Sequence, residues 1–186
     1  MRRLLWLLAL FLSLGAAPAA GGTFVLPSLR LTAGPAALLP GGSVGAAVNL
    51  QAGVILRPVH GRSVLELLDW GPIVWVDGGY HGRPATAPSE PNLHLGGLGL
   101  AGGYGSIWIA ADYGARFVAG SSDGQLALGL RHGAALNALF HVLRLEVAHQ
   151  LLAVAGQIRH ELQLTLGLDV GMILGGALLT RLPVLP

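Results

Sequence analysis

The segment "ELQLTLGLDVGMIL" (161–174) alternates between apolar and other side chains with a period of two. Every even position from Leu162 to Leu174 is apolar. The odd positions hold Glu161, Gln163, Thr165, Gly167, Asp169, Gly171 and Ile173. Successive side chains of a β-strand point to opposite faces, so this pattern predicts a strand with one apolar face and one polar face.

The same alternation recurs along the chain. All even positions from Val44 to Leu56 are apolar, and segments 106–113 and 124–131 alternate in the same way. Turns or loops are predicted where turn-forming residues such as Gly and Pro cluster, at 34–42, 58–62, 78–92, 101–105, 119–124 and 153–156. Pro72 predicts a bulge or break within a strand. We predict eight strands, or nine if the C-terminal tail pairs, near 23–33, 43–57, 63–77, 93–101, 106–119, 125–136, 139–152 and 158–174.

Segment 134–155 has two readings, because it contains neither Gly nor Pro and also fits an apolar helical stripe. We expect a strand at 139–152, since the strongly alternating segment after it needs a neighbour with which to pair. A helix lying across a sheet is the alternative.

The amino-acid composition indicates whether such strands lie in water or in a membrane. Hydrophobic residues make up 53% of the chain and charged residues 11%, whereas a soluble domain carries about 25% charged residues. No internal stretch reaches the ~18 uninterrupted apolar residues of a transmembrane helix. Apolar residues spread one in two along strands are typical of a membrane β-protein. The net charge of +2 and the lack of a basic stripe argue against nucleic-acid binding, and the absence of Cys excludes disulfides and thiolate metal sites.

The N-terminal residues have the three parts of a secretory signal peptide. Arg2 and Arg3 precede an apolar run from Leu4 to Leu14, and small residues follow in Ala17-Pro18-Ala19. We predict a signal peptide at 1–19 and one mature domain at 20–186. A membrane anchor is the alternative, but the apolar run is too short to cross a bilayer of ~30 Å as a helix.

Either a soluble sandwich or a transmembrane barrel could impose the alternation. The polar faces favour the barrel, because they are rich in small and uncharged residues, because charge is scarce overall, and because the predicted signal peptide would export the chain. A closed barrel also satisfies every backbone hydrogen bond in lipid. The predicted fold is therefore all-β: an antiparallel, up-and-down transmembrane β-barrel of about eight strands.

The mature portion resembles the small outer-membrane β-barrel proteins of diderm bacteria, which are mostly eight-stranded. The resemblance covers nearly all of the mature chain, but it is architectural and includes no family-specific motif. It implies a location in the cell outer membrane, in contact with the lipid bilayer. Members of this group commonly end in a strand with a C-terminal aromatic residue, and "RLPVLP" departs from that pattern. Aromatic residues near predicted strand ends would form interfacial girdles: Trp70, Trp75, Tyr80, Tyr104, Tyr113 and Phe117.

The polar face of the strands defines the candidate site. With eight strands, a barrel interior is just wide enough for side chains to fill it. Alternation assigns nine residues to a polar network in the lumen: Asn49, Gln51, Arg131, Arg144, Glu146, Arg159, Glu161, Gln163 and Asp169. We interpret this network as structural, with charges of opposite sign satisfying each other. A narrow ion path or a ligand site is the alternative.

No catalytic, cofactor or metal site is predicted. The seven histidines form no HExxH motif, and the Gly-rich segment 97–105 lacks the Lys-Ser/Thr ending of a phosphate loop. His60 and Ser63, which flank a turn, are a weak catalytic pair. We expect an outer-membrane barrel with a structural, surface-exposed or minor-channel role and no catalysis. The alternatives are a soluble periplasmic or secreted β-barrel or sandwich that binds an apolar ligand and, third, a lipid-modifying barrel enzyme. The sequence assigns no small-molecule ligand.

Overall fold

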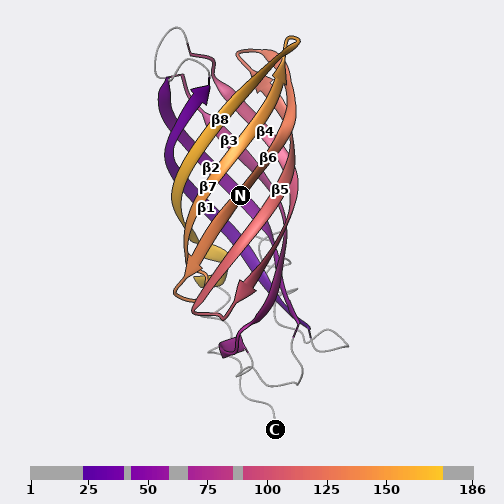
Figure 1. Ribbon diagram of the computed structural model, residues 1–186, viewed down its shortest axis with the longest axis vertical. Coiled ribbons are helices and arrows are strands. Elements are labelled where there is room, and N and C mark those ends of the chain that lie inside the picture. The colour runs from indigo at the N-terminus through magenta and orange to yellow at the C-terminus, as the bar shows by residue number, and fades with distance from the viewer. Residues whose placement is uncertain (1–22, 40–42, 59–66, 86–89, 174–186) are drawn as a thin grey trace, which may run out of the picture.

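Eight antiparallel strands close into a barrel in the computed structural model, which describes residues 23–39, 43–58, 67–85 and 90–173 (Figure 1). Each strand pairs with its neighbours in the sequence, and β8 pairs with β1. The strands are β1 (Thr23–Leu39), β2 (Val44–Pro58), β3 (Gly71–Arg83), β4 (Leu93–Gly105), β5 (Ile109–Ser122), β6 (Gln125–Ala138), β7 (Leu143–Val154) and β8 (Gln157–Asp169). The predicted all-β, up-and-down barrel is confirmed.

The strands are staggered around the barrel. Paired residues followed from Leu29 of β1 through all eight strands lead back to β1 at Leu39, a shift of ten residues. A stagger of this kind tilts the strands by about 35–45° from the barrel axis and leaves an interior that side chains fill. The tilt is visible in Figure 1.

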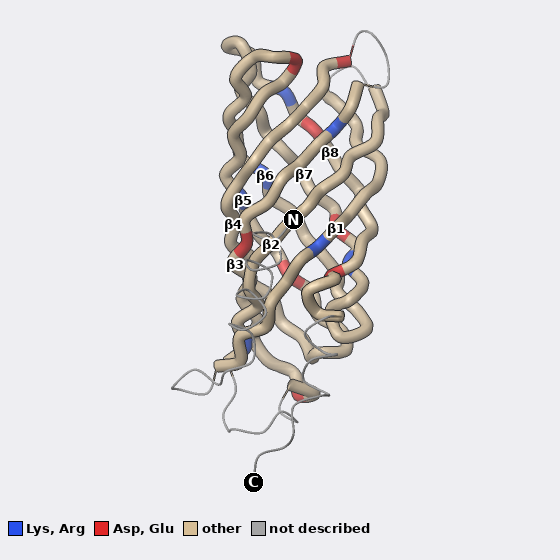
Figure 2. The backbone as a smooth tube through the Cα atoms, turned by 180° about the vertical axis from the view of Figure 1, so that it is seen from behind, with Lys and Arg blue, Asp and Glu red and all other residues tan. Residues whose placement is uncertain are grey.

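The two faces of the sheet differ in charge. Along β2, exposed and buried residues alternate, with even positions facing outward. In the same alternation, every Arg, Asp and Glu of the eight strands occupies an inward position, and none occupies an outward one. Figure 2 marks these charged positions along the tube. The outward face of the strands is therefore apolar or uncharged throughout.

All six predicted turn regions are wrong in part, because backbone pairing continues into them. β1 runs through 34–39, β2 includes Pro58, β3 includes 78–83, β4 continues through 101–105, β5 runs to Ser122 and β7 to Val154. Of the strand predicted at 63–77, residues 71–77 belong to β3, 67–70 do not, and 63–66 lie outside the described residues. The β3–β4 register is uninterrupted from Gly71 to Arg83, so Pro72 causes no bulge. Pro35 lies where the β1–β8 ladder is interrupted between Ala33 and Ala36, as its missing N–H requires.

Segment 134–155 contains the end of β6 and all of β7, so the strand expected at 139–152 is confirmed, shifted to 143–154, and the helical alternative is wrong. The last predicted strand is shorter than expected. β8 ends at Asp169, and residues 170–173 form a single helical turn. No helix in the described ranges is long and apolar enough to cross a membrane.

Two hairpins turn within two residues. Asp123 and Gly124 join β5 to β6 with φ of 52° and 78°, and Ala155 and Gly156 join β7 to β8 with φ of 51° and 78°. Positive φ at both central residues is the type I′ geometry, whose twist matches that of the flanking strands.

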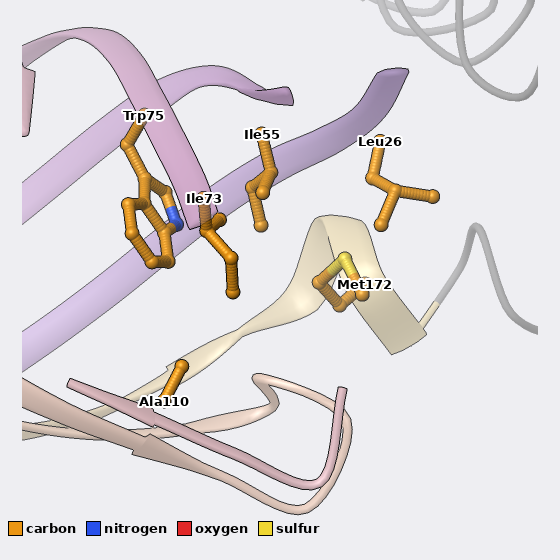
Figure 3. Packing of buried hydrophobic residues seen from close by; sticks show 6 residues of the cluster. All are labelled: Leu26, Ile55, Ile73, Trp75, Ala110 and Met172. Atoms are coloured by element: carbon orange, nitrogen blue, oxygen red, sulfur yellow. The ribbon is translucent and has the colours of Figure 1, made fainter. Parts of the chain in front are cut away.

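Apolar side chains form two separate layers inside the barrel. The first lies beside the helical turn at 170–173 and contains Leu26, Ile55, Ile73, Trp75, Ala110 and Met172 (Figure 3). The second lies toward the β5–β6 and β7–β8 turns and contains Leu93, Leu95, Val118, Ala127, Leu152 and Val154. Trp75 is 1% exposed, so its predicted place in an outward girdle is wrong.

Gly34 allows the barrel to close. A Cβ at this position would lie 2.0 Å from the carbonyl oxygen of Leu164 on β8. We expect Gly34→Val to lower the free energy of unfolding by about 1–3 kcal/mol, because the closing strands must move apart. The adjacent Ala33 is exposed, so Ala33→Val should change it by less than ~0.5 kcal/mol. Urea unfolding in detergent micelles measures both, and equal effects would contradict the role of Gly34.

Candidate functional site

The nine residues predicted to line the lumen all occupy inward positions. Eight of them are buried: Asn49, Gln51, Arg131, Arg144, Glu146, Glu161, Gln163 and Asp169. Arg159 is half-buried near the β7–β8 turn, and its Nη1 donates to Ser122 Oγ at 3.4 Å. The side-chain amide oxygen of Gln51 has no hydrogen-bond partner among the residues that the structure describes. These two residues therefore stand apart from the three hydrogen-bonded groups described next.

The first group centres on Arg144. Its guanidinium makes two bonds to Asp112, at 2.6 and 3.0 Å, and one to Glu146 at 3.2 Å. Arg131 Nη2 donates to the other oxygen of Glu146 at 2.7 Å. Asn137 joins this group by donating to Asp112 at 2.6 Å and accepting from Arg144 at 2.9 Å. Two guanidinium groups thus share two carboxylates inside the barrel.

The second group centres on Glu161. Its Oε1 accepts from Gln163 at 2.6 Å and lies 3.1 Å from His81 Nε2, while Oε2 lies 3.2 Å from Arg83 Nε. Asn49 connects this group to the first, because its side-chain oxygen contacts His81 Nδ1 and accepts from Arg131 at 3.0 Å. The two groups therefore form one continuous polar network.

The third group lies at the β1–β8 closure. Asp169 accepts from Ser28 Oγ, from the Leu29 amide at 2.9 Å and from Arg30 Nε at 3.3 Å. Arg30 also lies 3.6 Å from Asp77, whose other oxygen pairs with Arg116. The carboxylate of Asp169 thus fastens β8 to β1.

The network also contains residues that the sequence prediction missed: Arg30, Asp77, His81, Arg83, Asp112, Arg116 and Asn137. The alternation within 106–113 places Asp112 on the face opposite the apolar residues, which could have identified it as a lumen residue. His81 and Arg83 were missed because they fell in a predicted loop.

Charge is balanced within the ion-paired part of the strands. Five arginines and five acids of the strands are linked by ion pairs, and each of these arginines has at least one acidic partner: Arg30, Arg83, Arg116, Arg131 and Arg144, with Asp77, Asp112, Glu146, Glu161 and Asp169. Buried charges are tolerated when they are paired and hydrogen-bonded. These ion pairs therefore compensate the charge of the five arginines within the polar network.

The polar network lies between the two apolar layers. A partly open pocket of about 40 Å³ lies beside it, with Gln51, Asp77, Arg116, Arg131, Arg144 and Glu146 among its lining residues. A water needs roughly 10–15 Å³ of such volume, so the pocket has room for a few waters and not for an organic ligand. In the described part of the chain, no group of three or more His, Asp or Glu could hold a metal ion.

Four exposed aromatic side chains lie outside the barrel at the end where β4 meets β5 and β6 meets β7. Two pairs are in contact: Trp70 with Tyr104, with ring centroids 6.2 Å apart, and Trp108 with Phe140, 4.1 Å apart. Trp70 and Tyr104 fit the predicted girdle. Tyr80, Tyr113 and Phe117 face outward within their strands, away from the strand ends, and do not fit it.

His141 is buried in the turn between β6 and β7. Leu139, Phe140 and His141 have φ of 51°, 60° and 60°, a conformation that non-glycine residues rarely adopt. His141 is 4% exposed and packs against the edge of Trp75 at 5.9 Å. Burial, followed by the charges of Arg30 and Arg57, lowers the pKa of His141 to about 4.

Acidification should therefore destabilise the barrel through this turn. Between pH 6.5 and 4 the unfolded chain binds a proton at His141 that the folded chain does not, so stability falls as pH falls, by up to about 3 kcal/mol. Asn adopts positive φ more readily than most residues and does not titrate in this range. The unfolding free energy of His141→Asn should therefore fall less than that of the wild type between pH 7.5 and 4.5. Urea unfolding at the two pH values measures this, and equal pH dependence in both proteins would contradict it.

No family model matches this chain, and no curated protein sequence matches it. Among solved structures, the crystal structure of Ail, the attachment invasion locus protein of Yersinia pestis, is similar, with 16% sequence identity and a TM-score of 0.26. The match covers 80% of this chain and 98% of the Ail chain. The fold assignment rests on this chain's own strand register.

Proposed function

We propose that this chain is an exported outer-membrane β-barrel with a structural, non-catalytic role, surrounded by the lipid bilayer. One observation carries the proposal: every charged residue of the eight strands occupies an inward position, and no charged residue lies on the outward face. Lipid requires such a surface, because charged groups on the lipid-facing side of a barrel are destabilising.

The exposed surface supports lipid as the surroundings. Large outward side chains are widely exposed, including Leu98 at 76%, Leu126 at 68% and Leu166 at 62%. Soluble monomers rarely expose contiguous apolar patches above a few hundred Å². The soluble alternative, a barrel or sandwich that binds an apolar ligand, would instead need polar residues outside and an apolar cavity inside.

Two further features fit this location. The exposed Trp70, Tyr104, Trp108 and Phe140 gather at one end of the barrel, where aromatic side chains would lie at a membrane interface. The predicted signal peptide at 1–19 would supply export; it lies outside the described residues, as does the departing C-terminal "RLPVLP".

A structural role is favoured over a channel role, because apolar layers lie at both ends of the ion-paired network. The lipid-modifying alternative depends on His60 and Ser63, which lie outside the described residues. We therefore assign the interior a stabilising role.

Fractionation and gel mobility test the membrane assignment. The protein should remain in membranes after a high-pH wash, and the unheated sample should migrate faster on a denaturing gel than the heated one, because a closed barrel resists detergent. Release by the wash, without a heat-dependent shift, would contradict it. In planar bilayers we expect no discrete conductance steps, and reproducible steps would restore the channel reading.

A further inference from the structure

Four polar side chains form a hydrogen-bonded row across the outward face of β5–β8. Tyr113 Oη lies 2.9 Å from His132 Nδ1. His132 Nε2 lies 3.2 Å from His149 Nδ1, and His149 Nε2 lies 3.2 Å from His160 Nδ1. One residue comes from each strand, so the row crosses half of the barrel. We call these four residues the histidine row.

The middle of the histidine row, His132 and His149, is embedded within apolar surface. Along β6, the outward neighbours of His132 are leucines on the side of the β5–β6 turn, and Ala134 and Leu136 on the other side. His149 lies between Val147 and Leu151 on β7. If the barrel spans a bilayer, as proposed above, these imidazoles lie at hydrocarbon depth.

Imidazoles facing hydrocarbon need hydrogen-bond partners, and polar groups inside membranes commonly mark contact or functional sites. Within the row, neutral imidazoles can donate and accept in one continuous direction from Tyr113 to His160. His160 Nε2 at the end of the row has no hydrogen bond among the described residues. The row is therefore stable in the absence of water, but it retains polar atoms that could bond to another polar surface.

We infer that the outward face of β5–β8 binds a second copy of this chain within the bilayer, with the histidine row at the centre of the contact. A second copy fits the chemistry, because His160 Nε2 is a donor when the row runs in one direction and an acceptor when it runs in the other, so the ends of two rows are complementary. Two copies inserted in the same direction place equal residues at equal depth, as a two-fold axis requires. The outward face of β2, in contrast, is apolar throughout.

Cross-linking in liposomes tests this interface, because the chain contains no native cysteine. Ala134→Cys places a thiol beside His132, and Ala46→Cys places a thiol at an exposed position on β2. At high lipid-to-protein ratio, we expect a short bis-maleimide to give at least fivefold more cross-linked dimer with Ala134→Cys than with Ala46→Cys. Equal yields would overturn the inference.

A triple variant, His132→Leu/His149→Leu/His160→Leu, tests the row itself. The leucines make the surface more apolar, so this variant should still insert, and its Ala134→Cys dimer yield should fall at least fivefold. His94→Leu is the matched control, because His94 faces outward on β4 and bonds to Tyr80 rather than to the row; its yield should not change. An unchanged yield in the triple variant would overturn the inference. If the wild-type chain shows no heat-dependent shift on a denaturing gel, the membrane assignment is contradicted, and an interface within the bilayer is contradicted with it.

Discussion

Replacing Arg144 with methionine is expected to lower the free energy of unfolding by about 3–5 kcal/mol, the range for breaking a buried ion pair. Arg144 is the only described ion-pair partner of Asp112, and it shares Glu146 with Arg131. Its loss leaves the buried Asp112 carboxylate without a compensating cation. Urea unfolding in detergent micelles, followed by tryptophan fluorescence, measures the change.

The control for this prediction removes the stranded charge. Asp112→Asn added to Arg144→Met keeps an acceptor for Asn137 and should recover at least half of the lost stability, because no unpaired carboxylate then remains at that position. Asp123 is exposed in the β5–β6 turn, so Asp123→Asn should change stability by less than ~0.5 kcal/mol. A loss below about 1 kcal/mol for Arg144→Met would show that the network does not hold the barrel together.

Asp169→Ala is expected to destabilise the barrel by about 3 kcal/mol, because it removes a buried partner of Arg30 and several hydrogen bonds at the β1–β8 closure. Asp169 also accepts from the Met172 amide at 3.1 Å and so caps the helical turn at 170–173. We therefore expect Met172 to become more accessible, and peroxide to oxidise it faster, as mass spectrometry of its peptide would show.

Asp169→Asn is the conservative comparison, since it keeps oxygen acceptors for the backbone amides but loses the charge that faces Arg30. Its stability and its Met172 oxidation rate should lie between those of the wild type and Asp169→Ala. If Asp169→Ala oxidises at the wild-type rate and keeps its stability within about 1 kcal/mol, the closure does not depend on this carboxylate.

The sequence predicts the architecture well where alternation is unbroken. The strand predicted at 43–57 is found at Val44–Pro58, and the side facing inward is the expected one. Strand ends were less predictable around Gly and Pro. Gly78 and Gly79 suggest a loop by composition, yet they pair with β2 and β4, which no local pattern reveals. Long-range pairing overrides local turn preference there.

The sequence predicts which residues line the lumen better than it predicts which of them are in contact. Alternation places Asn49, Arg131 and Glu161 inside the barrel, but it does not give the stagger that decides which of them meet. Arg131 and Asn49 are separated by 82 residues, and His81 and Glu161 by 80, so these bonds depend on the closed register. The histidine row depends on the register of β5–β8 in the same way.

Spin labels along β8 test most directly whether the apolar face contacts lipid. Single cysteines at 162, 164, 166 and 168, and at the inward positions 163 and 165, can be labelled in the liposome-reconstituted protein. At the even positions we predict high collision rates with oxygen and low rates with a water-soluble nickel complex, and at the odd positions low rates with both. High nickel accessibility at the even positions would place the leucine face in water and contradict the account.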